Sequence, residues 1–198
     1  MGRALVDTVT VARLRAAGAT LADMRDPSKK LPPGLASSVP DDAQLALGGE
    51  MQACGAFGSL FGAEFAQSLA DDLSNGYLLD AAERSCAAKW FRAPDRRGIV
   101  AKMILDIRPS ADDTHDLASL LLDCIGIARL SAFDAHVTLS SKERSCIDAL
   151  ARRDPDAVKA IANLIGGSGD VVAPLEHLHA RSAACLTPAH LAQLGGTG

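Results

Sequence analysis

Cysteine and histidine are the residue types in this chain that could support covalent chemistry. A cysteine nucleophile needs a histidine base within hydrogen-bond reach. The nearest candidate is Cys124, which lies nine residues from His115 and twelve from His136. Both separations exceed two turns, so one uninterrupted helix cannot bring either pair together. An enzyme with a thiol and histidine site assembled from distant residues is therefore kept only as an alternative function.

The spacing of the cysteines argues against cross-linking. There are five of them, no Cys-x-x-Cys motif occurs, and the number is odd. A disulfide framework and a zinc ribbon both need closer or paired spacings. We therefore expect free, mostly buried thiols at all five positions. These positions are Cys54, Cys86, Cys124, Cys146 and Cys185.

Two further patterns resemble ligand sites but fall short of them. His177 and His179 are two residues apart, so on a helix they point about 200° apart and do not share a metal ion. His190 lies nearby in sequence, but a solvated region rich in capping residues explains this segment better. The glycine-rich segment 166–169 is not followed by Lys-Ser/Thr, so it is not a P-loop. The sequence predicts no metal and no cofactor.

Charge is unevenly distributed along the chain. Residues 31–82 contain seven acids and no Lys or Arg, whereas residues 83–108 contain seven basic and three acidic residues. Such segregation steers and orients partners, and Arg and Trp often dominate the energetics of interfaces. The predicted partner-binding residues are Arg84, Lys89, Trp90, Arg92, Arg96 and Arg97.

This charge pattern has three interpretations. The acidic and basic elements can pair with each other inside the fold, because surface ion pairs are common and individually weak. The basic segment can instead bind another protein or a second copy of the chain. Thirdly, basic residues 84–102 can bind nucleic acid or anionic lipid. A net charge of −4 and a pI near 5.7 argue against a dedicated nucleic-acid binder, so this interpretation is kept as an alternative.

From these patterns the sequence predicts a non-enzymatic protein–protein interaction module. Such a module acts as an adaptor, regulator or assembly factor through its helical surfaces. This prediction depends on two observations: no polar groups converge in a catalytic arrangement, and the charges are segregated along the chain.

Composition predicts the fold class. Apolar residues make up 48% of the chain, 36 residues are alanine, and only 4% are aromatic. Alanine is the strongest helix former, and strands are enriched in aromatic and β-branched residues. We expect an all-α orthogonal helical bundle, of which stacked helical hairpins are one form.

Proline and glycine suggest where the elements begin and end. Four prolines in residues 27–40 exclude regular structure there. We expect residues 1–40 to form an N-terminal helix and a Pro-rich loop, and residues 41–198 to form the helical core domain. A helix should begin at Asp41 and end at Gly48-Gly49. Residues 112–133, apolar on every side, should form one central helix.

The tetrapeptide Glu-Arg-Ser-Cys occurs at residues 83–86 and again at 143–146. The similarity extends over residues 83–104 and 143–165, in which each helix is followed by a proline-started second helix. Convergent capping chemistry explains this similarity most simply, and two helical hairpins that stack in the same way are the alternative explanation.

The sequence also carries weak indications of location. Met1–Ala17 contains Asp7, Arg13 and Arg15, so it lacks the apolar core of a signal peptide. Met51–Ala63, the longest uncharged apolar stretch, is too short to span a bilayer. We expect a cytoplasmic protein. Fourteen of the twenty basic residues are arginine, which is consistent with a GC-rich bacterial genome.

Overall fold

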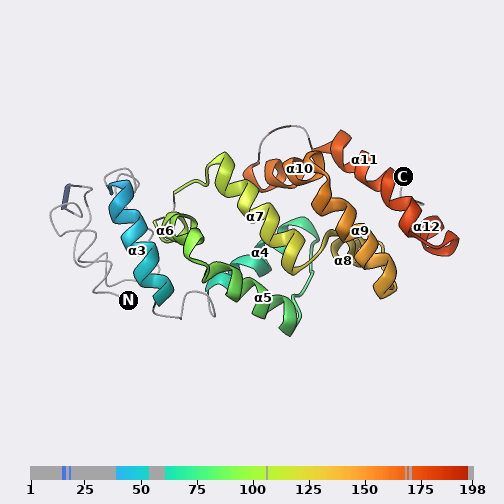
Figure 1. The fold of residues 1–198 in the computed structure, drawn as a ribbon, viewed down its shortest axis with the longest axis horizontal. Coiled ribbons are helices and arrows are strands. Elements are labelled where there is room, and N and C mark those ends of the chain that lie inside the picture. The colour runs from blue at the N-terminus through green and yellow to red at the C-terminus, as the bar shows by residue number, and fades with distance from the viewer. Residues whose placement is uncertain are drawn as a thin grey trace. The chain divides into compact units, whose positions relative to one another are not determined.

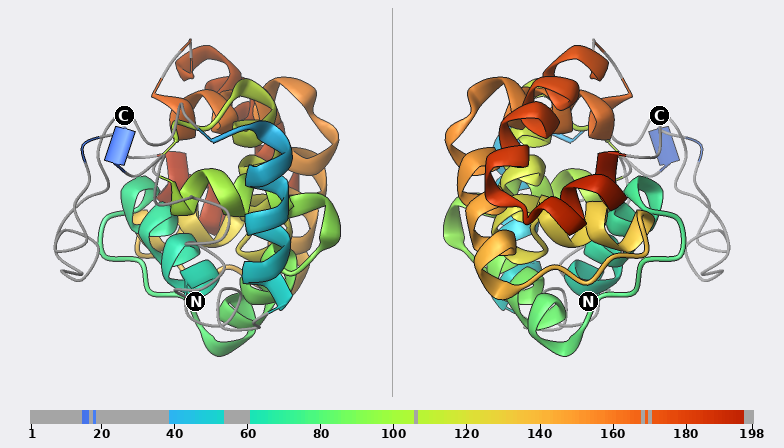
Figure 2. Two further views of the ribbon diagram at one scale, coloured as in Figure 1. Left: turned by 90° about the vertical axis from the view of Figure 1, so that its left-hand side faces the viewer. Right: turned by 90° about the vertical axis from the view of Figure 1, so that its right-hand side faces the viewer.

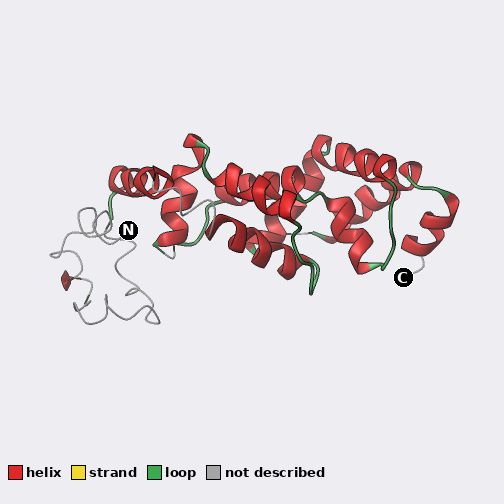
Figure 3. Cartoon of the chain, turned by 90° about the horizontal axis from the view of Figure 1, so that it is seen from below, coloured by secondary structure: helices red, strands yellow, loops and turns green. Residues whose placement is uncertain are grey.

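The computed structural model describes residues 15–16, 18, 39–53, 61–105, 107–167, 169 and 171–195. Within these residues the regular structure is entirely helical, which confirms the predicted all-α class (Figure 3). None of the described helices is long and apolar enough to cross a membrane. The α-helices are α3 (Asp41–Ala53), α4 (Ala63–Leu73), α5 (Ala81–Phe91), α6 (Arg97–Ile104), α7 (Ala111–Cys124), α8 (Ile127–Asp134), α9 (Ser141–Arg153), α10 (Pro155–Gly166), α11 (Val172–Ser182) and α12 (Pro188–Gly195).

Two short 3₁₀ turns join some of these helices, η4 (Pro94–Arg96) before α6 and η5 (Ala183–Cys185) after α11. The chain folds as two compact units, and helix α5 belongs partly to each. Unit 1 contains residues 1–62 and 88–109, and unit 2 contains residues 63–87 and 110–198.

Unit 1 is built on the packing of α3 against α6. The expected break at Gly48-Gly49 is wrong, because α3 continues through both glycines to Ala53 as one helix (Figure 2). Gly48 faces α6 so closely that a Cβ atom there would lie 2.0 Å from the carbonyl oxygen of Arg97. The glycine therefore permits close helix approach and does not end the helix.

Unit 2 has α7 at its centre, packed against α10 (Figure 1). The side chains of Leu117, Leu120 and Leu121 are almost fully buried, as expected for a helix apolar on every side. The expected single helix over 112–133 is wrong, however. The chain turns at Gly126, where φ is +84°, and a separate helix, α8, begins. This φ favours glycine because it lacks a Cβ atom.

The predicted helix start at Asp41 is confirmed, and local side chains cap two further helices. Ser140 caps α9 through a capping box, in which its hydroxyl accepts from the Glu143 N–H and the Glu143 carboxylate accepts from the Ser140 N–H. Asp154 caps α10, and Pro155 occupies its first turn.

The internal similarity extends well beyond the shared tetrapeptide. Helices α8, α9, α10 and α11 follow the order of α4, α5, α6 and α7, at an offset of 60 residues that becomes 61 after Asp154. The turns before α5 and α9 both have a positive φ, at Gly76 and at His136. Leu79 and Leu139, which follow these turns, are buried to the same extent. The correspondence supports two copies of one helical unit.

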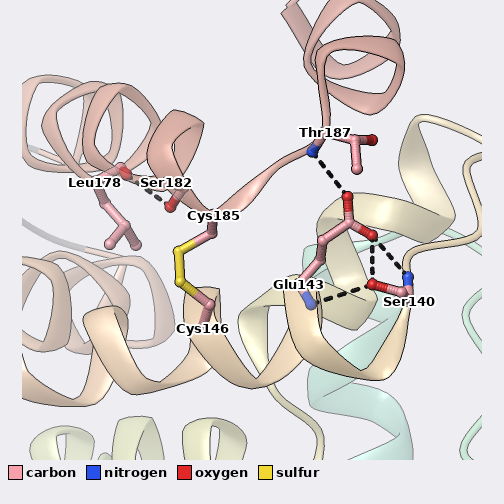
Figure 4. Close-up of a disulfide and its surroundings, with 7 residues drawn as sticks. All are labelled: Ser140, Glu143, Cys146, Leu178, Ser182, Cys185 and Thr187. Atoms are coloured by element: carbon pink, nitrogen blue, oxygen red, sulfur yellow. Dashed lines mark hydrogen bonds between the residues drawn. A yellow bond between two sulfur atoms is a disulfide. The ribbon is translucent and has the colours of Figure 1, made fainter.

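Four of the five cysteines form disulfides, so the expectation of free thiols is wrong for these four. Cys86 is bonded to Cys124, with a Cα–Cα distance of 5.3 Å. Cys146 is bonded to Cys185, with a Cα–Cα distance of 5.6 Å, and Figure 4 shows this second disulfide. The bonds span 38 and 39 residues, so each lies at the corresponding place in its copy. Cys54 lies outside the described residues.

Candidate functional site

Five of the six predicted partner-binding residues belong to unit 1, where they lie at the end of α5, in the turn that follows it and at the start of α6. We refer to them as the basic-aromatic patch. Trp90 is half-buried, and the guanidinium carbon of Arg96 lies 4.6 Å from the centroid of its ring. This geometry is a cation–π contact. The basic-aromatic patch consists of Lys89, Trp90, Arg92, Arg96 and Arg97.

Local chain geometry fixes the position of the patch. Pro94 follows α5 and opens η4, so the chain turns before α6 begins. The side chain of Gln52 on α3 donates to the carbonyl oxygens of Phe91 and Ala93, each at 2.8 Å. These bonds satisfy carbonyl groups at the end of α5 and hold that end against α3. The indole of Trp90 in turn lies edge-on to the ring of Phe91, with centroids 4.9 Å apart.

Three of the four cations of the patch are accessible. The side chains of Lys89, Arg92 and Arg97 are exposed, and Arg96 lies 3.4 Å from the exposed carboxylate of Asp95. Lys89 lies in the last turn of α5, where a positive charge also favours the helix dipole. The patch thus combines a fixed aromatic surface with positive charges that solvent or a partner can reach.

Arg84 is not part of this arrangement. It lies in unit 2, where its guanidinium donates to the Leu79 carbonyl oxygen at 3.1 Å and to Gln67 Oε1 at 3.2 Å. It therefore serves to join α5 to α4 within that unit.

At least one acid of residues 31–82 forms an ion pair outside the basic segment. The carboxylate of Asp80 lies 2.7 Å from Arg129, a residue of the second copy. Arg129 also pairs with the buried Glu83. Sequence reasoning missed Arg129 because an isolated arginine carries no local signal.

Glu83 organises the polar centre of unit 2. Its carboxylate accepts from the Tyr77 hydroxyl at 2.7 Å, from the Asp80 N–H at 2.7 Å, and from Arg129. Burial, followed by the bond to Glu83, raises the pKa of Tyr77 above its usual range. Hydrogen bonds to Asp80 and then Glu83 raise the pKa of Arg129. Glu83 is thus fully engaged by structural partners.

A polar cleft of about 460 Å³ lies beside this centre, and the Cys86–Cys124 disulfide forms part of its wall. Burial raises the pKa of Asp148, which also lines the cleft, although its Oδ1 accepts from the Ala128 N–H at 3.0 Å. Asp148 thereby stabilises the start of α8. Because Cys124 is bonded to Cys86, it has no free thiol to act as a nucleophile with His115 or His136.

The C-terminal histidines serve different purposes. His190 binds Glu143, with Nδ1 and Oε1 2.8 Å apart, whereas His177 and His179 are exposed on α11. Among the described residues no group of three or more His, Cys, Asp or Glu is placed to hold a metal ion. The Glu143–His190 contact links α9 to α12.

Comparisons of the chain with protein-family models, curated proteins and solved structures give no match.

Proposed function

We propose that this protein is a non-enzymatic interaction module that binds an acidic partner protein through the basic-aromatic patch. The observation that carries the proposal is the cation–π contact of Arg96 with Trp90, flanked by the exposed Lys89, Arg92 and Arg97. Rigid aromatic and arginine side chains anchor protein interfaces, and surrounding charges speed the association of complementary partners.

The polar groups of unit 2 support a binding role over catalysis. Glu83 and Glu143 are both occupied by hydrogen bonds from neighbouring elements. Four cysteines are occupied by disulfides. An adaptor, regulator or assembly factor is consistent with this arrangement, and self-association through the same patch is the nearest variant.

Direct binding measurements test the proposal. The full chain is titrated with a fluorescent poly-glutamate peptide, single-stranded DNA, and vesicles containing an anionic phospholipid. An acidic protein partner predicts binding to the peptide that weakens with salt and falls at least about tenfold in Lys89→Glu/Arg92→Glu. The matched control, Lys142→Glu/Arg152→Glu on α9, should bind as the wild type does.

The outcomes separate the alternatives. Binding to DNA or vesicles without binding to the peptide would overturn the protein-partner proposal and favour a polyanion binder. An equal loss in both double variants would show that net charge, and not the patch, governs binding. Trp90→Ala should also weaken binding, because the ring holds Arg96 in place.

The two disulfides also bear on location. We propose that the protein acts in an oxidising compartment, because structural disulfides persist there and are rare in the cytoplasm. The test is to block free thiols during lysis of the native cells and then determine the mass of the protein. Two intact disulfides are expected, whereas five blocked thiols would support the cytoplasmic location instead.

A further inference from the structure

We propose that Cys146–Cys185 is a thiol–disulfide exchange site, at which a dithiol reductant releases helices α11 and α12 from α9 while Cys86–Cys124 stays closed. The two bonds correspond in the two copies but have different surroundings. Cys146 is exposed and Cys185 is half-buried, whereas Cys86 and Cys124 are both half-buried at the wall of the cleft. Exchange requires a thiolate to reach a sulfur atom of the disulfide, so access favours attack at Cys146.

The packing of the linked helices differs even more. The first disulfide joins α5 to α7, whose Leu117, Leu120 and Leu121 are at most 2% exposed. The second joins α9 to the end of η5, directly after α11, in which only Leu178 and Ser182 are buried. When its disulfide is broken, α7 is therefore still held in place by the burial of its apolar side chains. The same contribution is much smaller for α11.

Comparison of the two copies explains this difference. The residues of α11 that correspond to Leu117, Ala118, Leu120 and Leu121 of α7 are Leu178, His179, Arg181 and Ser182. Three of these four buried positions of α7 are therefore polar in α11. A polar outer face is typical of the last unit in a stack of helical repeats.

Helix α11 packs against both α9 and α10, and the terminal helices also make polar contacts. Glu143 accepts from the Thr187 N–H at 2.9 Å and contacts His190, and Arg181 lies 2.7 Å from Asp154 (Figure 4 shows the Glu143–Thr187 bond). Beneath them Leu186 and Leu194 pack on a small cluster that contains Ile147. This packing is incomplete, because a pocket of about 250 Å³ lies against the same cluster.

The exchange step is balanced when the dithiol is the reductant. A thiolate of the reductant attacks Cys146 Sγ, the Cys146–Cys185 bond breaks, and Cys185 leaves as a thiolate. The second thiol of the reductant then attacks the mixed disulfide and frees Cys146. The protein disulfide gains two electrons and two protons, and the dithiol becomes a disulfide. Release of α12 uncovers the apolar side chains of Ile127 and Ile147, against which Leu186 and Leu194 pack.

The proposal is tested on the full oxidised chain carrying Cys54→Ser, which removes the fifth cysteine. The protein is equilibrated with increasing dithiothreitol, quenched with an alkylating reagent and digested, and the alkylation of each cysteine is measured by mass spectrometry. Cys146 and Cys185 should become alkylated at a dithiothreitol concentration about tenfold lower than Cys86 and Cys124. Hydrogen exchange at that concentration should show lost protection in residues 172–195, with residues 111–124 still protected.

A double variant gives a second, independent measurement. Cys146→Ser/Cys185→Ser should lose protection in residues 172–195 without any reductant, and the matched control Cys86→Ser/Cys124→Ser should keep it. The proposal is wrong if both bonds open together, if Cys86–Cys124 opens first, or if residues 172–195 stay protected after Cys146–Cys185 is reduced. If a double variant does not fold, the dithiothreitol experiment on the protein with both disulfides still tests whether Cys146–Cys185 opens first.

Discussion

Glu83 and Glu143 occupy corresponding positions in the two copies, but their carboxylates have different partners. Glu83 binds Arg129, and Glu143 binds His190, which follows Cys185 by the same five residues that separate Arg129 from Cys124. Hydrogen bonds from the Thr187 N–H, then Ser140 and His190, lower the pKa of Glu143 well below its ordinary value of 4.5. An aspartate or glutamate with a depressed pKa stabilises the fold only while it is ionised.

The first prediction concerns acid stability. Because the pKa of Glu143 is lower in the folded chain, its contribution is present above about pH 4.5 and is lost as the pH falls toward the folded-state pKa. At about pH 6, Glu143→Gln should have a lower urea midpoint than the wild type. Between about pH 6 and about pH 3, the urea midpoint of the variant should fall less than that of the wild type. Glu176→Gln, at an exposed position on α11, is the control and should follow the wild type. If the urea midpoint of Glu143→Gln depended on pH as that of the wild type does, ionised Glu143 would not stabilise the fold.

The second prediction concerns two glycines of similar φ. Gly126→Ala combines an unfavourable backbone (φ +84°, ψ 133°) with a Cβ only 2.6 Å from Asp148 Oδ2. Gly76→Ala has a similar φ of +85° but open space around the new atom. Denaturant unfolding should show a loss of about 1 kcal/mol for Gly76→Ala and at least about 3 kcal/mol for Gly126→Ala. Equal losses would mean that Asp148 moves away freely.

At the scale of elements, the close approach of α3 and α6 depends on a single missing methyl group. Gly48→Ala places a Cβ against the Arg97 backbone, where neither helix has a flexible atom to move. We expect a loss of about 1–3 kcal/mol, although alanine favours the helix itself. Gly98→Ala on α6 is the matched control, because its nearest neighbour is a Leu45 methyl carbon at 3.8 Å.

Denaturant unfolding of these two variants measures the difference directly. Gly98→Ala should leave stability unchanged or raise it by up to about 1 kcal/mol, since only helix propensity changes. A stabilising Gly48→Ala would contradict the described packing of α3 on α6.

Elements were predictable where local chemistry decides them. The caps at Ser140 and Asp154 and the start at Asp41 follow from side chains within a few residues. Gly48 and Gly126 were misjudged because their roles depend on distant partners, Arg97 and Asp148. A glycine pair inside a helix and a single glycine that divides one have no distinct local signature.

The candidate site was predictable only in part, for the same reason. The cluster around Trp90 follows from sequence proximity, since Lys89, Arg92 and Arg96 are within six residues of it. Its support by Gln52, and the engagement of Arg84 by Gln67, depend on tertiary contacts. The disulfides were missed because bonds across 38 and 39 residues leave no short motif.

At the scale of the whole molecule, the disulfides restrict the unfolded chain. Closing a loop of 38 residues lowers the entropy of that state by an amount worth about 4 kcal/mol in the chain-entropy model. Cys86→Ser/Cys124→Ser should therefore lose about 4 kcal/mol in denaturant unfolding. The control, Ser85→Ala at the neighbouring exposed position, should change little. A loss below about 1 kcal/mol would show that α7 gains nothing from the bond.

His136 holds a positive φ of 54° at the position where the first copy has Gly76. The two copies can therefore be aligned with each other, and each position at which they differ shows two residues that the same helical unit accommodates. Transferring a residue from one copy to the corresponding position of the other is a starting point for engineering. The simplest example is His136→Gly, which introduces the glycine found at position 76 of the first copy.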